Sequence, residues 1–165
     1  MGQGFRHSAF YYNGNQKIMN VDLKDILSKL PYRDPFLFVN ELIYVDAEGI
    51  VGNYTFNEDL EFYRGHFYEK AITPGVILIE TMAQIGLACL GIFLLNKELT
   101  HGSAIALTST EIQFLKPVYP KEKVTVFSKK IYFRFGKLKC EVIMKNEAGQ
   151  EVCKGILAGM ITEEL

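Results

Sequence analysis

The stretch from Thr73 to Asn96, TPGVILIETMAQIGLACLGIFLLN, decides the fold. Its apolar part, Gly75 to Leu95, carries a single charge, that of Glu80. A run of about 20 apolar residues is long enough to cross the hydrocarbon core of a membrane. However, polar residues such as Glu80 and Gln84 lie in its first half, where lipid makes them costly. We therefore favour a helix buried inside the protein over a membrane span.

Both ends of this run carry residues typical of helix boundaries. Thr73 is a good N-cap and Pro74 suits the first helical position, so we expect the helix to begin there. We expect it to end near Asn96. Gly86 and Gly91 lie inside the run, where their small size allows close packing against a sheet.

The sequence around this helix forms short segments of alternating apolar and polar residues, separated by turn residues. Such a pattern is typical of antiparallel strands. We expect a short amphipathic helix from Asp22 to Leu30. The predicted strands are residues 36–45, 50–56, 104–115, 124–135, 138–144 and 151–161, with a loop over 57–70. A sheet that curls around one apolar helix satisfies both patterns, so the predicted fold class is α+β, an antiparallel sheet wrapped around a long central helix.

The composition is that of one globular domain. Hydrophobic residues make up 48% and charged residues 22% of the chain. The formal net charge is −1, which excludes a general polyanion-binding protein, since such proteins are basic. Residues 21–165 show no linker or repeat and are predicted to form a single domain. Residues 1–20 follow neither a helical nor a strand period, so we interpret them as a flexible tail, an artificial addition or an extension from an upstream start.

The cysteines, Cys89, Cys140 and Cys153, lie in apolar or strand segments. No pair of them has the spacing of metal ligands. We therefore predict buried, reduced thiols in a cytoplasmic protein, with neither a metal nor a cofactor.

Two ionisable residues near the helix start could carry chemistry. On a helix, Gln84 lies one turn after Glu80 on the same face, within hydrogen-bond reach. A carboxyl in apolar surroundings suits a general acid, although a structural Glu held by Gln84 fits the same pattern. His66 is a candidate base, although a loop histidine is often only a surface residue. With the free N–H groups of a helix start between them, the pair suits proton abstraction next to a carbonyl.

These residues lie in motifs of a known family. Gly65-His66-Phe67 and the run from Pro74 to Gln84 resemble the signature of the bacterial 3-hydroxyacyl-[acyl-carrier-protein] dehydratases, hotdog-fold enzymes of fatty-acid synthesis. The segment from Pro31 to Val39 is similar to the start of the family's first strand, and Phe114 to Val118 to the exit of a later one. The resemblance covers roughly residues 20 to 162.

The resemblance implies a role for each matching residue. His66 would remove the C2 proton of a 3-hydroxyacyl thioester, and Glu80 would protonate the departing 3-hydroxyl. The backbone N–H groups of Gly75 and Val76 would bind the thioester carbonyl, and Gln84 would orient Glu80. The product would be a trans-2-enoyl thioester.

The resemblance also implies the partners. The substrate would be carried on acyl carrier protein, and its acyl chain would run along an apolar tunnel. The active sites would lie at the interface of a homodimer, each built from two chains; an assembly of three such dimers is left open. The near-neutral charge predicts no nucleic-acid partner, and the polar residues in the apolar run predict no insertion into a membrane.

One loop departs from the family pattern. Tyr68-Glu69-Lys70 stands where the family usually has Pro-Gly, so the loop that shapes the tunnel differs. A hotdog acyl-thioesterase and a non-catalytic acyl-thioester-binding module therefore remain as alternatives.

The C-terminal half of the chain is basic. Its cations form either a solvated face of the sheet or a docking patch for the acidic carrier. They are Lys121, Lys123, Lys129, Lys130, Arg134, Lys137 and Lys139.

Overall fold

A computed structural model describes residues 22–95 and 104–162 of the chain. The prediction for residues 1–20 lies outside this part. The elements are, in chain order, α1 (Leu23–Ser28), β1 (Glu41–Val45), β2 (Gly49–Thr55), a 3-10 helix η1 (Glu61–Arg64), α2 (Gly75–Ala83), a π-helical segment η2 (Gln84–Cys89), α3 (Leu90–Leu95), β3 (Ala104–Phe114), β4 (Lys123–Arg134), β5 (Lys137–Asn146) and β6 (Glu151–Thr162).

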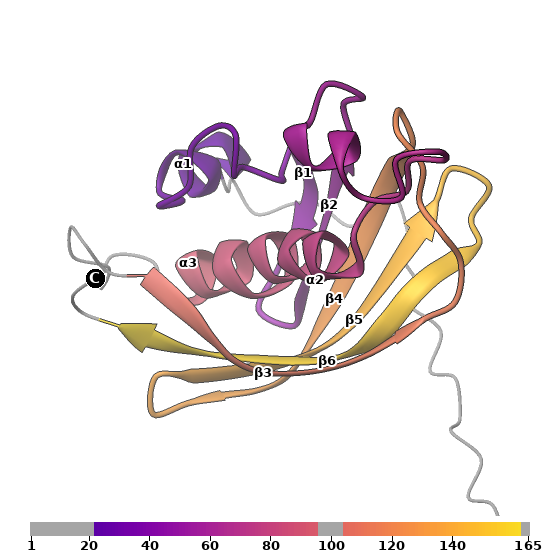
Figure 1. Ribbon diagram of the computed structural model, residues 1–165. Helices are drawn as coiled ribbons and strands as arrows, with labels where there is room; N and C mark the ends of the chain where they lie inside the picture. The colour runs from indigo at the N-terminus through magenta and orange to yellow at the C-terminus, as the bar shows by residue number, and fades with distance from the viewer. Residues whose placement is uncertain (1–21, 96–103, 163–165) are drawn as a thin grey trace, which may run out of the picture.

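The strands form one antiparallel sheet in the order β1-β2-β4-β5-β6-β3. Strand β3 crosses over to pair with β6, and this leaves β1 and β3 at the two edges. The sheet curves beneath the helix formed by α2, η2 and α3, while α1 and the loop after β2 lie above it (Figure 1). The structure thus confirms the α+β prediction and shows the hotdog arrangement.

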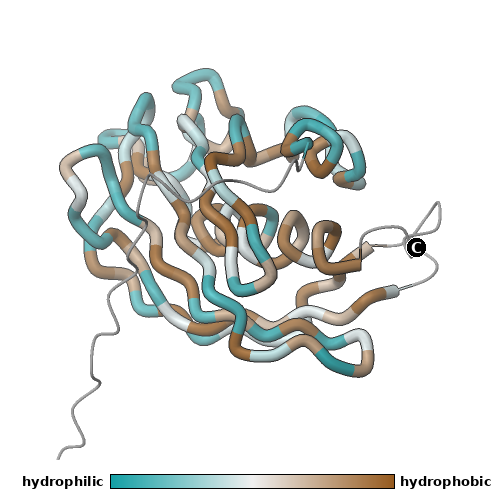
Figure 2. The backbone as a smooth tube through the Cα atoms, turned by 180° about the vertical axis from the view of Figure 1, so that it is seen from behind, coloured by the Kyte–Doolittle hydropathy of each residue, from teal (hydrophilic) through white to brown (hydrophobic). Residues whose placement is uncertain are grey.

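The long helix is the centre of the core. Met82, Ile85 and Leu90 on it are completely buried, and Figure 2 shows it as an apolar element inside the curve of the sheet. By length and composition alone, residues Gly75–Leu95 could cross a membrane. However, 72% of the most apolar window of this helix is buried within the protein. The prediction of a helix enclosed by protein is therefore confirmed.

The glycines of this helix allow it to lie directly on the sheet. A Cβ atom at Gly86 would come within 3.0 Å of the Ser128 Cβ on β4, and one at Gly91 would overlap the side chain of Ile105 on β3. The Ser128 hydroxyl donates a hydrogen bond of 2.9 Å to the Gly86 carbonyl. This bond lies in the π-helical segment, which the sequence pattern did not predict. A side-chain donor that replaces a backbone one is a common cause of such local changes in a helix.

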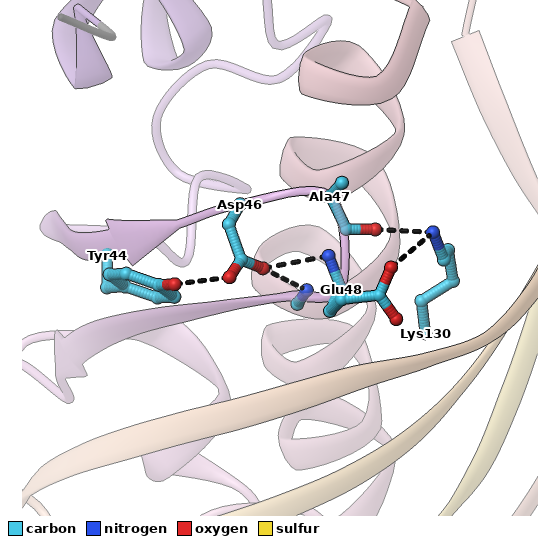
Figure 3. A network of polar contacts seen from close by, with 6 residues as sticks. Tyr44, Asp46, Ala47, Glu48 and Lys130 are labelled. Atoms are coloured by element: carbon cyan, nitrogen blue, oxygen red, sulfur yellow. Dashed lines mark hydrogen bonds and ion pairs between the residues drawn. The ribbon is translucent and has the colours of Figure 1, made fainter. Parts of the chain in front are cut away.

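The turn between β1 and β2 is tied to β4 by side chains. The Asp46 carboxylate accepts hydrogen bonds from the backbone N–H groups of Glu48 and Gly49, and the Tyr44 hydroxyl contacts it as well (Figure 3). Lys130, at a bulge in β4, donates to the Ala47 carbonyl and forms an ion pair with Glu48. Lys130 therefore stabilises the β1–β2 turn of its own chain.

Two local predictions were wrong. The first strand begins at Glu41 rather than at residue 36, because the backbone of Phe36 and Phe38 bonds the Gln84 side chain instead of a neighbouring strand. Thr73 does not cap the long helix: Pro74 is the N-cap residue, and no side chain bonds the helix start. The Thr73 backbone N–H bonds the Val118 carbonyl. Its hydroxyl lies 2.5 Å from the Tyr63 hydroxyl, so Thr73 anchors the preceding loop rather than the helix.

All of the cysteines are buried free thiols, as expected. Burial raises the pKa of Cys140 to about 11 and that of Cys153 to about 12. Thiols with such values stay protonated near neutral pH and react slowly, so these cysteines act as packing residues.

Candidate active site

His66 follows η1 and is held in one orientation by the backbone of its own loop. Its Nδ1 lies 2.8 Å from the Ile72 carbonyl oxygen. Because a carbonyl oxygen only accepts, Nδ1 carries the proton and Nε2 is left as the basic nitrogen. The ring is half-buried and packs edge-on against Phe67, with 4.6 Å between the ring centroids. This is the tautomer that a general base needs.

Glu80 lies in α2 and is held by Gln84, one turn further along the same face. The Gln84 Nε2 donates a hydrogen bond of 2.9 Å to Glu80 Oε1 and another of 2.9 Å to the Phe36 carbonyl. The Gln84 Oε1 accepts from the Phe38 N–H at 2.8 Å. Since Gln84 is fully buried and uses both ends of its amide, its rotation is fixed, and so is the position of the bonded Glu80 oxygen.

Glu80 also lines a cavity of about 280 Å³. The other lining residues come from the segment after α1, from the long helix and from the start of β3, and all but one are apolar: Pro31, Tyr32, Phe36, Ala83, Leu87, Ala104, Ile105, Ala106 and Leu107. The exception is Tyr32, whose hydroxyl is a polar group. The sequence analysis did not predict Tyr32 as a site residue, because the motif Pro31 to Val39 was interpreted only as the start of the first strand.

The start of α2 offers free backbone donors. The N–H groups of Ile77 and Leu78 bond the Pro74 carbonyl. Among the hydrogen bonds of the described residues, none is donated by the N–H of Gly75 or Val76. The Val76 side chain is 71% exposed, and the Phe114 ring packs over Gly75, where a Cβ atom would come within 2.9 Å of it. Two such adjacent donors can bind an oxygen that gains negative charge.

Within one chain, His66 and Glu80 lie at different places. Glu80 and Gln84 meet, but His66 is absent from the described residues that line the Glu80 cavity, and no hydrogen bond there joins His66 to Glu80. The cavity nevertheless opens beside β3, the edge strand. A second chain that meets this edge would therefore lie close to Glu80.

The loop Tyr68-Glu69-Lys70, which departs from the family pattern, contacts the loop that carries Tyr119. The Lys70 ammonium lies 5.3 Å from the centroid of the Tyr119 ring, and the Tyr68 side chain is 79% exposed.

Three of the cations in the candidate carrier-binding patch already have partners in the chain. Lys121 pairs with Glu58 at 2.7 Å, Lys130 binds the β1–β2 turn, and Arg134 lies over the Tyr132 ring.

Among the described residues, no cluster of His, Cys, Asp and Glu could hold a metal ion. The groups described above, an imidazole, a carboxyl and two backbone N–H donors, are those that acid–base chemistry uses.

A family model, the FabA-like domain, matches residues 30–155. The chain belongs to the FabA-like family. Two curated FabA-like relatives are called 3-hydroxyacyl-[acyl-carrier-protein] dehydratase FabZ. The one from Bartonella quintana is 31% identical over 153 residues, covering 91% of this chain and 96% of the relative. The one from Brucella abortus is 33% identical over 151 residues, covering 88% and 92%.

Solved structures confirm the fold of this FabA-like chain. The dehydratase heterocomplex ApeI:P from Xenorhabdus doucetiae matches with a TM-score of 0.69 at 15% identity, covering 83% of this chain and 90% of that one. A hypothetical thioesterase from Streptococcus pneumoniae, solved with coenzyme A, matches with a TM-score of 0.57 at 16% identity, covering 87% and 98%. At such identities these likenesses concern the hotdog fold alone.

Proposed function

We propose that the protein dehydrates 3-hydroxyacyl thioesters carried on acyl carrier protein, as a lyase of fatty-acid biosynthesis in the cytoplasm. The observation that carries the proposal is the presence of a basic His66 Nε2 and a fixed Glu80 carboxyl in a chain that matches dehydratases along most of its length. A hydrolase needs a water held against the thioester carbon, whereas these groups are suited to moving protons at C2 and C3.

The proposed reaction is an elimination. His66 Nε2 takes the C2 proton, and the electron pair of that C–H bond forms the C2=C3 double bond while the C3–O bond breaks. The departing oxygen takes the proton of the Glu80 carboxyl and leaves as water. The N–H groups of Gly75 and Val76 bind the thioester carbonyl oxygen while it carries negative charge. Transfer of the proton from His66 back to Glu80 through solvent restores the site.

We place the two catalytic residues of one site on different chains of a homodimer. In the described part of the chain, the outer edge of β3 has no strand beside it, and this strand is 11 residues long. Apolar side chains lie exposed near this edge and the helix start, among them Phe114 at 51% and Leu107 at 41%. Pairing of two β3 edges would cover these groups and bring the partner's loop toward Glu80. Assembly of three dimers is a further option that this contact leaves open.

One assay separates dehydration from hydrolysis. We expect a 3-hydroxyacyl thioester incubated with the protein to give the ultraviolet absorbance of an enoyl thioester without release of free thiol. Release of thiol at the same rate as substrate loss would instead identify a thioesterase. Binding of the substrate without either signal would identify a non-catalytic acyl-thioester-binding module. Heat-denatured protein serves as the blank for both signals.

A further inference from the structure

Tyr32 lies in the wall of the cavity beside Glu80, and the catalytic scheme above gives it no role. Its side chain is half-buried, and its ring packs against Phe36 with 6.3 Å between the centroids. Among the described residues, the Tyr32 hydroxyl has no hydrogen-bond partner. No buried side-chain nitrogen or oxygen of the described residues lacks a hydrogen-bond partner, so the Tyr32 hydroxyl is accessible to solvent. An accessible hydroxyl in the wall of the cavity that Glu80 lines is available to a ligand.

The segment that carries Tyr32 is firmly held. The Arg33 guanidinium donates to the carbonyls of Leu30 and Tyr32, at 3.0 Å and 2.7 Å, and fixes the turn after α1. Further along, the Gln84 amide that binds Glu80 also binds the backbone of Phe36 and Phe38. The Gln84 amide therefore ties Glu80 to the segment that follows Tyr32, while Arg33 holds the turn at Tyr32 itself.

The electrostatic surroundings keep the Tyr32 hydroxyl protonated. Burial raises the pKa of Tyr32 above its ordinary value, and the pKa rises further whenever Glu80 is ionised. A neutral phenol beside Glu80 can donate a hydrogen bond but cannot act as a base near neutral pH.

We infer that the Tyr32 hydroxyl is a further catalytic group, which donates a hydrogen bond to the substrate oxygen that leaves C3, beside the Glu80 carboxyl. This inference rests on the proposed dehydration. As the C3–O bond breaks, negative charge develops on that oxygen, and a second donor stabilises it until the proton of Glu80 arrives. Tyr32 keeps its own proton throughout, so the balance of the reaction is unchanged: one C–H and one C–O bond break, one C=C bond forms and water leaves.

The test replaces only the hydroxyl. Tyr32→Phe keeps the ring against Phe36, so we expect an unchanged melting temperature and dimer mass. We expect kcat for enoyl formation to fall roughly 10- to 100-fold with KM changed by less than about threefold, because the lost bond is strongest in the transition state. Tyr32→His, which keeps a ring with an N–H donor, should recover part of the lost kcat. Tyr132→Phe, on β4 away from the cavity, is the matched control and should retain the wild-type kcat.

Two results would overturn the inference. One is a wild-type kcat in Tyr32→Phe, and the other is a raised KM with unchanged kcat, which would make Tyr32 only a wall of the acyl pocket. The proposed function is tested separately by His66→Ala and Glu80→Gln. If these two abolish enoyl formation while Tyr32→Phe leaves it intact, dehydration stands and the role of Tyr32 falls. If His66→Ala and Glu80→Gln retain full activity, the proposed dehydration at this site is wrong, whatever Tyr32→Phe shows.

Discussion

Two inactive variants, His66→Ala and Glu80→Gln, are expected to restore dehydration when they are combined in one dimer. Each change alone removes a proton-transfer group and should lower kcat roughly 10²- to 10⁴-fold. A mixed dimer contains one site that has His66 from one chain and Glu80 from the other, while its second site lacks both. Random pairing makes about half of the dimers mixed, so about a quarter of the wild-type activity should return.

The measurement is enoyl formation after the two variants are coexpressed with different affinity tags and purified through both tags in turn. This selection isolates the mixed dimer, so about half of the wild-type activity is expected in that fraction. The matched control is a dimer carrying both substitutions on one chain and a wild-type partner, which retains no complete site under the same scheme. If the doubly tagged His66→Ala and Glu80→Gln dimer stays as inactive as its parents, each site is built within one chain.

The second large effect is expected from Gln84→Leu. Leucine fills a similar volume but leaves the Phe36 carbonyl and the Phe38 N–H without their hydrogen-bond partner. Each unsatisfied buried group costs about 1–3 kcal/mol, so the loss of both hydrogen bonds should lower the free energy of unfolding by roughly 2–6 kcal/mol. Denaturant unfolding followed by circular dichroism measures this fall.

Activity should fall in Gln84→Leu even under conditions where the protein remains folded. Its Glu80 carboxyl loses the donor at 2.9 Å that fixes its orientation. Gln84→Glu is the informative companion, because a protonated Glu can replace only one of the two Gln84 donors. A variant Gln84→Leu that unfolds like the wild type would contradict the buried network described here.

The architecture could be read from the sequence because a few strong patterns determine it. A long run with one charge has to be enclosed, and alternating strands with tight turns have to form an antiparallel sheet. The Glu80–Gln84 contact followed from helical spacing alone. The cross-over that places β3 at the edge beside β6 could not be read, because it depends on pairing between distant segments rather than on local periodicity.

Two of the features that the sequence analysis missed involve side chains that replace backbone partners. Gln84 bonds the backbone at the start of the expected first strand, which therefore begins late, and Ser128 binds the Gly86 carbonyl in the π-helical segment. Thr73, a good N-cap by composition, bonds Tyr63 and Val118 instead. Tyr32 stands out only once the cavity around Glu80 is known. Each of these depends on which residues the tertiary fold places in contact.

The β3 edge also bears on the solubility of the protein. In the described part of the chain, no strand pairs with the outer edge of the 11-residue β3, and Phe114 and Leu107 on this strand are exposed. Such an edge is a template on which another extended chain can add. Natural edge strands are usually blunted by proline, lysine or a covering segment, and β3 itself contains neither proline nor lysine. A substitution that prevents two chains from meeting here is therefore expected to yield aggregates that grow edge to edge, rather than a well-behaved monomer.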